Sequence, residues 1–144
     1  MSKIYDVARY ITATCGEISA MKLQKLMYYA QAWHMVWEEE PLFAEDFEAW
    51  ANGPVLPAIY NKHRGCFKVA ESLFNEGDTS NLTEKEKENI EKVLEFYGDK
   101  TAQWLSNLTH QEDPWLKARG DTPIGDPSNK IIPLSEIHEY YSSL

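Results

Sequence analysis

The chain has 144 residues, of which 43% are hydrophobic and 26% are charged, and this length suits a single globular domain. Such a domain buries roughly 70% of the surface that its unfolded chain exposes, which is enough for a core without disulfide bonds. The two cysteines, Cys15 and Cys66, do not suggest a disulfide framework. The sequence has no signal-peptide pattern and no apolar run of membrane-spanning length, so we expect one cytoplasmic domain, residues 1–144, without membrane association.

Acidic residues outnumber basic ones, with 23 Asp and Glu against 14 Lys and Arg and a formal net charge of −9. Phosphate contacts dominate affinity for DNA and RNA, so this charge argues against independent nucleic-acid binding. A local basic site is the alternative, although a solvated helix end explains its residues more simply. That site would comprise Lys62, His63, Arg64 and Lys68. The charge balance favours a basic protein partner instead.

The longest helical pattern covers about residues 20–38 and has apolar side chains on two flanks. Ser19 suits the N-cap, Ile18 and Leu23 fit a hydrophobic staple, and neither Gly nor Pro interrupts the pattern before Pro41. A helix that is apolar on two sides is normally covered on both, so we expect this one to be the core of the fold. One flank comprises Leu23, Leu26, Met27, Ala30, Trp33, His34 and Trp37, and the other comprises Tyr29, Ala32 and Val36.

Shorter elements are predicted on both sides of this central helix. Residues 3–14 have helical periodicity and end at Gly16. Residues 42–53 fit either a helix or a short strand at 47–50. Pro54 is predicted to open a helix that ends at Arg64–Gly65, and residues 65–82 are predicted to be a surface connection. The apolar residues expected in the Pro54 helix are Val55, Leu56, Ile59 and Tyr60.

The second half of the chain begins with a helix-start signal. Thr83 and Glu86 form a capping box for a helix that ends at Gly98. The overall prediction is a mainly α, compact helical bundle around the central helix, with a short two-stranded β element as an addition. The remaining predicted elements are a helix over 101–109 with Trp104, Leu105 and Leu108 inward, a helix opened by Pro114, a loop over 119–129, an extended segment over 131–133 that pairs with residues near 47–50, and a last helix from about 135 to 142.

No complete catalytic or metal-binding motif is present. His34 lies on the apolar arc of the central helix, so we interpret it as a hydrogen-bonded core histidine. A zinc site made from Cys15, His34, Cys66 and His110 lacks the local ligand spacing of zinc sites. His110 and Glu112 would form an acid–base pair only if both faced one cleft, which leaves a small enzyme or metal-dependent hydrolase as an alternative. We expect no catalytic site, no metal and no cofactor.

Three stretches of the sequence are similar to the Panacea domain, also called the SocA-like antitoxin domain, of bacteria and their phages. These stretches are KLQKLMYYAQAWH at 22–34, FEAWANGPVLPAIYNK at 47–62 and LTHQEDPW at 108–115. The I-x-x-Y-Y pattern at 137–141 also fits. The resemblance implies a mainly helical, non-enzymatic domain that binds and neutralises a toxin encoded by the adjacent gene.

The resemblance also marks a set of residues that define the fold or contact the toxin, of which the first role is the simpler interpretation. Family members are paired with varied toxins, including small alarmone synthetases and translation blockers, so no list of toxin contacts transfers to this chain. The marked residues are Gln24, Tyr28, Trp33, Trp50, Gly53, Pro54, Tyr60, His110, Pro114 and Trp115.

Two further roles in protein–protein binding are compatible with the same resemblance. One is a proteolytic adaptor that delivers its partner to a protease, and the other is a phage protein that binds a host defence protein. For a toxin partner, we hypothesise that the acidic segments 38–48 and 84–95, or the loop 119–129, help to occlude it. Affinity would depend more on buried aromatic anchors than on charges at the rim.

Overall fold

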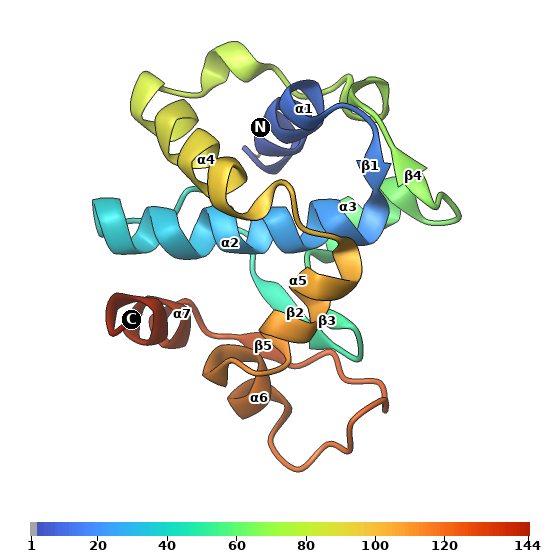
Figure 1. Ribbon diagram of the computed structural model, residues 1–144, viewed down its shortest axis with the longest axis vertical. Helices are drawn as coiled ribbons and strands as arrows, with labels where there is room; N and C mark the ends of the chain where they lie inside the picture. The colour runs from blue at the N-terminus through green and yellow to red at the C-terminus, as the bar shows by residue number, and fades with distance from the viewer. Residues whose placement is uncertain (1–2) are drawn as a thin grey trace.

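The computed structural model describes residues 3–144 and confirms a mainly α fold arranged around one long central helix, α2 (Figure 1). Helices α1, α4, α5 and α7 all contact α2. Within residues 3–144, no helix is both long enough and apolar enough to cross a lipid bilayer. The helices are α1 (Ile4–Cys15), α2 (Ala20–Glu38), α3 (Pro57–His63), α4 (Glu84–Tyr97), α5 (Ala102–Thr109), α6 (Asp113–Arg119) and α7 (Leu134–Ser142), with the 3-10 helices η1 (Glu71–Phe74) and η2 (Thr79–Asn81) between α3 and α4.

Helix α2 forms the predicted core. Ser19 Oγ accepts a hydrogen bond from the backbone N–H of Lys22 at 3.1 Å, which confirms the N-cap. Leu23 and Met27 of one expected flank and Tyr29 and Ala32 of the other are buried, so both flanks of the helix are covered. The predicted burial of Trp37 is wrong, because this side chain is 40% exposed and stacks on Trp33 near the end of the helix.

Three short antiparallel strands form a sheet in the order β3-β2-β5, with β2 (Phe47–Trp50) in the centre. Phe47 pairs with Ile132 of β5 (Ile131–Ile132). This register selects the strand over the helix for residues 47–50 and confirms the predicted pairing with the segment near 131. The sheet has one strand more than predicted, since β3 (Gly53–Val55) pairs with the other edge of β2.

Pro54 belongs to β3, so the predicted helix start at this residue is wrong. Gly53 adopts a φ of +119°, which permits the sharp turn between β2 and β3. Pro54 pairs with Ala49 from an edge strand, where a missing backbone N–H is tolerated. Helix α3 begins three residues later with Pro57 at its start, so Val55 lies outside the helix.

The segment 65–82 is more structured than the predicted surface connection. Lys68–Val69 forms strand β4, which pairs with β1 (Ile18–Ser19). Val69 is buried, and Phe74 is fully buried in η1, which packs against α1. The sequence prediction missed these residues because single apolar side chains among turn residues have no periodicity.

Helices α4 and α5 differ in how well the sequence predicts their faces. In α4, Thr83 Oγ1 accepts from the Glu86 N–H at 3.1 Å and Glu86 Oε1 accepts from the Thr83 N–H at 2.8 Å, which confirms the capping box. In α5, Leu105 is buried as predicted. The predicted burial of Trp104 is wrong, because its ring is 42% exposed and lies beneath the Lys100 ammonium.

Candidate functional site

Gln24 connects the central helix to the junction of β3 and α3. Its fully buried amide donates to the Leu56 carbonyl at 3.3 Å and accepts from the Leu56 N–H at 2.8 Å. Its Nε2 also lies 3.0 Å from Nε2 of His63. These bonds satisfy backbone groups that would otherwise be buried without partners, so Gln24 fixes the start of α3.

Trp115 fastens α6 to β2. Its indole N–H donates to the Trp50 carbonyl at 2.9 Å, and the His110 ring stacks on it with centroids 4.2 Å apart. Arg119 lies over the same indole and donates to the Ala49 carbonyl at 3.1 Å. The packing of Trp115 against His110 at the end of α5 is therefore internal to the chain.

Lys25 is a fully buried amine that the sequence analysis did not single out. Its Nζ donates to the Pro54 carbonyl at 3.4 Å, and burial lowers the pKa of Lys25 to about 7 because the charged form loses its hydration. Gly53 leaves space for this side chain, since a Cβ atom there would lie 2.6 Å from Lys25 Cε and 3.0 Å from Thr109 Oγ1. A glycine is thus required both by the turn and by the lysine beneath it.

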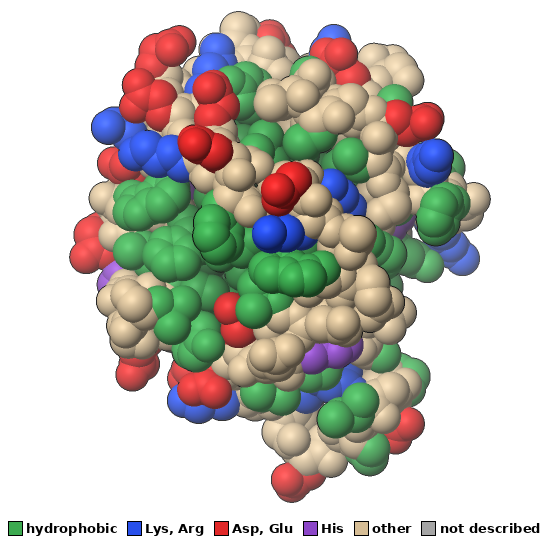
Figure 2. Space-filling model, viewed as in Figure 1, with side chains coloured by type: hydrophobic (Ala, Val, Ile, Leu, Met, Phe, Trp, Pro, Cys, Tyr) green, Lys and Arg blue, Asp and Glu red, His purple; other side chains and the backbone are tan. Residues whose placement is uncertain are grey.

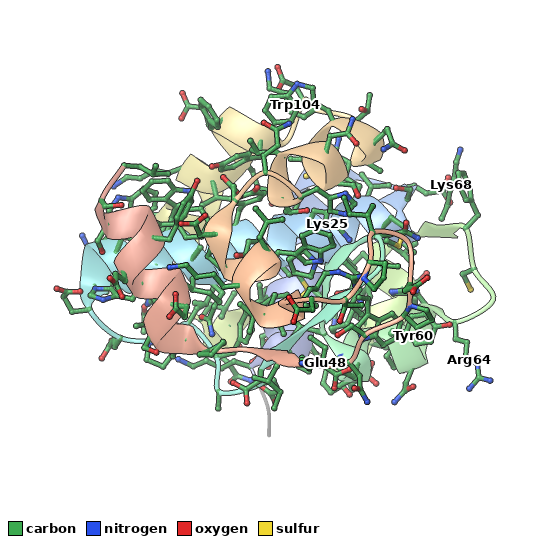
Figure 3. All side chains as sticks on the ribbon, turned by 90° about the horizontal axis from the view of Figure 1, so that it is seen from below. Lys25, Glu48, Tyr60, Arg64, Lys68 and Trp104 are labelled. Atoms are coloured by element: carbon green, nitrogen blue, oxygen red, sulfur yellow. The ribbon has the colours of Figure 1, made fainter. Side chains whose placement is uncertain are left out.

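A cleft of about 630 Å³ opens beside these residues, and we call it the polar cleft because Gln24, Asn52 and His63 line it among apolar side chains. Figure 3 shows Tyr60 at this end of the molecule, with Lys25 further inside and Arg64 and Lys68 at the outer edge. A smaller adjoining pocket of about 440 Å³ shares Tyr60 and contains His110. The residues that line the cleft are Met21, Gln24, Trp50, Ala51, Asn52, Val55, Tyr60, His63, Pro127, Ser128 and Asn129.

Two histidines of the cleft and its adjoining pocket are held toward the neutral state. Desolvation lowers the pKa of both His63 and His110, and the nearby Lys25 charge lowers it further. His110 Nε2 is buried without a hydrogen-bond partner in the described part of the chain. His63 is buried and Lys62 pairs with Glu76 at 2.7 Å, so the alternative basic site is not a continuous exposed patch.

A second hollow lies on another face, and we call it the aromatic groove. Figure 2 shows a broad hydrophobic area there, interrupted by a small acidic one. Its volume is about 530 Å³, and it runs between the end of α2, helices α4 and α5, and the C-terminal residue. It is lined by Trp33, Trp37, Lys92, Val93, Phe96, Tyr97, Trp104, Leu108, Glu112 and Leu144.

The rings of Trp37, Phe96 and Trp104 are exposed in the aromatic groove, while the Tyr97 ring is buried. Trp33 stacks on Trp37 with centroids 5.8 Å apart and donates its indole N–H to the Tyr97 hydroxyl at 3.0 Å. Phe96 is 63% exposed, and the Lys92 ammonium lies 5.2 Å from the Trp37 ring centroid. Large apolar side chains gathered in one exposed hollow typically mark an interaction site.

Glu112 closes the floor of the aromatic groove. Tyr29 and Tyr141 both donate their hydroxyls to its Oε1, at 2.6 and 2.7 Å. Burial raises the pKa of Glu112, and the two hydroxyls partly oppose that rise. Within residues 3–144, Glu112 forms no ion pair, so its carboxylate has hydroxyl donors but no cation.

The residues considered for chemistry do not meet. His110 and Glu112 open into different pockets, so they do not form the acid–base pair of the enzyme alternative. The described residues contain no group of three or more His, Cys, Asp and Glu arranged to hold a metal, so the zinc set is not assembled. His34 is buried, with Nδ1 3.2 Å from Asn89 Nδ2, which confirms it as a core histidine.

The residues marked by the family resemblance divide between these surroundings. Trp33 lines the aromatic groove, while Gln24, Trp50 and Tyr60 line the polar cleft. The others lie in the buried connections around the sheet and α6, apart from His110 in the adjoining pocket. These others are Tyr28, Gly53, Pro54, Pro114 and Trp115.

The comparison with protein families shows to which family the chain belongs. The family described as "Antitoxin SocA-like, Panacea domain" matches residues 23–116, which is more than half of the chain. The chain belongs to this family. The SocA-like match includes most of α2, the sheet strands β2 and β3, α4, α5 and the start of α6, so it takes in most of both the polar cleft and the aromatic groove.

A curated relative of this SocA-like chain agrees with the assignment. The protein is "Antitoxin SocA" of Caulobacter vibrioides (strain NA1000 / CB15N), which is 30% identical over 113 residues. The aligned region covers 68% of this chain and 58% of that protein, so the chain spans little more than half the length of this relative. No solved structure matches the chain.

Proposed function

We propose that the chain is an antitoxin that neutralises a cognate toxin by binding it directly, with the aromatic groove as the contact surface. The observation that carries this proposal is the exposed aromatic groove on a member of an antitoxin family. Trp and Tyr are enriched among the residues that dominate binding energy at protein interfaces. Four such residues line the groove together with Phe96, namely Trp33, Trp37, Tyr97 and Trp104.

The charge of the chain supports the same proposal. A net charge of −9 attracts a basic partner and accelerates its association, while the apolar groove supplies the affinity. Helix α4, which contains the acidic segment 84–95, forms one wall of the aromatic groove. We infer that this segment is better placed to occlude the toxin than segment 38–48 or the loop 119–129. The gene of the toxin is expected beside that of the antitoxin.

The test is co-expression with the product of the adjacent gene, followed by purification through a tag on one of the two proteins. Relief of toxicity together with a stable complex is the expected result. Phe96→Ser should weaken both, whereas Phe67→Ser is the matched control, because Phe67 is also exposed but lies outside the groove. A harmless neighbour that does not associate would refute the proposal.

A further inference from the structure

We propose that the aromatic groove takes an apolar segment of the partner that carries a Lys or Arg side chain, and that this cation pairs with Glu112. The inference rests on the proposed function and specifies the chemistry of the partner. It follows from Glu112, the one acidic side chain among the residues that line the groove, and from its hydrogen bond with Tyr29 of α2.

The first observation is the incomplete bonding of the Glu112 carboxylate. Glu112 is only 7% exposed, and both tyrosine hydroxyls donate to the same oxygen, Oε1. In residues 3–144 no group donates to Oε2, and this oxygen is not among the fully buried unpaired atoms, so it reaches the groove surface. A largely buried carboxylate without a counter-ion is costly, and a cation in the groove would offset that cost.

The second observation is that the groove already accommodates cations over its aromatic rings. Lys92 lies over Trp37, and Lys100 lies over Trp104 with Nζ 5.0 Å from the ring centroid. Trp33 and Tyr97 line the groove together with Glu112 and have no such cation among the described residues. Tyr97 is stacked on Tyr29 and is only 6% exposed, so an incoming Lys or Arg would meet chiefly the partly exposed Trp33 ring beside the carboxylate. An aromatic ring and a carboxylate both attract a cation.

The third observation is that the groove has a negative and a positive end. Glu112 is bonded to Tyr29, whereas Lys92 lies over Trp37, two turns further along α2. At about 1.5 Å per residue, the two levels are about 12 Å apart along the helix. A bound helical segment would thus place its cation at the Tyr29 end, and its residue two turns away would be apolar or acidic.

A second copy of this chain fits the groove less well. Two copies would each bring a formal charge of −9, which opposes their association. A purely apolar segment would seal Glu112 away from water without a counter-ion, and this increases the desolvation cost. A foreign segment with one cation and apolar neighbours avoids both penalties.

The experiment measures the affinity of the purified adjacent-gene product, inactivated if it is toxic, for matched variants of the antitoxin. Glu112→Gln should weaken binding by about 30-fold or more, the loss typical when one partner of a buried charge pair is removed. Glu95→Gln changes the net charge equally but lies outside the groove, and it should change binding less than about twofold. Trp104→Ala, which alters an exposed side chain, should also weaken binding.

A double-mutant cycle then identifies the cation. Each Lys and Arg of the partner is replaced by Ala, and one of them should show a strong coupling to Glu112→Gln and none to Glu95→Gln. Near-wild-type affinity of Glu112→Gln would overturn the inference even if Trp104→Ala weakens binding, and the proposed function would stand. If the wild-type protein does not bind at all, the proposed function fails and the inference with it. A dimer of the free protein that Trp104→Ala dissociates would assign the groove to self-association and overturn the inference.

Discussion

The polar cleft and the aromatic groove differ in how far their side chains are bonded within the chain. Around the cleft, Gln24 and Trp115 are buried, and their polar groups form hydrogen bonds with backbone atoms of Leu56 and Trp50. In the groove, the rings of Phe96 and Trp104 are exposed, and one oxygen of the Glu112 carboxylate receives no hydrogen bond from residues 3–144. The polar groups of Gln24 and Trp115 are therefore satisfied within the chain, while the groove presents exposed rings and a carboxylate oxygen that can still accept a hydrogen bond.

This difference separates the residues that hold the fold together from those that could be changed without disturbing it. The stretches that resemble the Panacea domain supply most of the internal connections, whereas Lys92, Phe96 and Trp104 of the groove lie between those stretches. Substitutions on α4 and α5 alter the groove without touching the hydrogen bonds of Gln24 or Trp115. Substitutions on α4 and α5 should therefore alter binding to the proposed toxin while leaving these internal connections intact.

The sharpest test of the comparison replaces one tryptophan in each region by alanine. Trp115→Ala removes a buried ring and leaves the Trp50 carbonyl without its donor, so we expect the free energy of unfolding to fall by about 3–5 kcal/mol. Trp104→Ala removes an exposed ring and should cost less than about 1 kcal/mol. Urea denaturation at pH 7 measures both, and equal losses would contradict the division between a structural cleft and a free groove.

Lys25 gives the second test, through pH. Its folded pKa of about 7 lies below the ordinary value of 10.5, so the unfolded chain binds the extra proton between these values. The penalty for burying Lys25 is full below pH 7 and disappears as pH rises toward 10.5. Lys25→Met should therefore stabilise the protein most at pH 7 and below, and its advantage should shrink by up to about 1.4 kcal/mol per pH unit above 7. Denaturation from pH 6 to pH 10 measures the difference, and an advantage independent of pH would show that Lys25 is not buried.

The sequence predicts those features of the fold that depend on neighbouring residues. Ser19 and Thr83 are recognisable as caps because the groups that they bond lie three residues away. Pro54 is misassigned because a Gly-Pro pair followed by apolar residues opens a helix as readily as it enters an edge strand. The deciding fact is the pairing of Pro54 with Ala49, which the local pattern does not contain.

The candidate groove is harder to predict because its residues come from distant segments. Glu112 meets Tyr29 from 83 positions away and Tyr141 from 29 positions away, so no spacing rule brings them together. One signal was available, since Phe96 falls outside the apolar stripe of Ile90, Val93, Leu94 and Tyr97 on the same helix. An exposed aromatic beside a complete stripe predicts a contact surface, although not its partner.

Glu112 tests the electrostatic character of the groove in the free protein. Burial raises its folded pKa above the ordinary value of 4.5, so folding favours the protonated carboxyl group. Its contribution to stability is present below about pH 4.5 and is lost as pH rises through the folded pKa. The stability of the wild type relative to Glu112→Gln should therefore decrease from pH 4 to pH 7. Paired urea titrations measure this trend, and the opposite trend would mean that a cation within the chain already neutralises Glu112.

Phe96→Ser is the smallest expected change in stability and the cleanest separation of binding from folding. The Phe96 ring is 63% exposed and contacts Tyr97 edge-on, so replacing it should alter the free energy of unfolding by no more than about 0.5 kcal/mol. Because the ring forms part of the groove wall, the same change should weaken the complex with the adjacent-gene product. Thermal unfolding and affinity are measured on one preparation, with Phe67→Ser as the control. A Phe96→Ser variant that unfolds readily would show that this ring stabilises the core. That result would contradict the assignment of the groove as a binding surface.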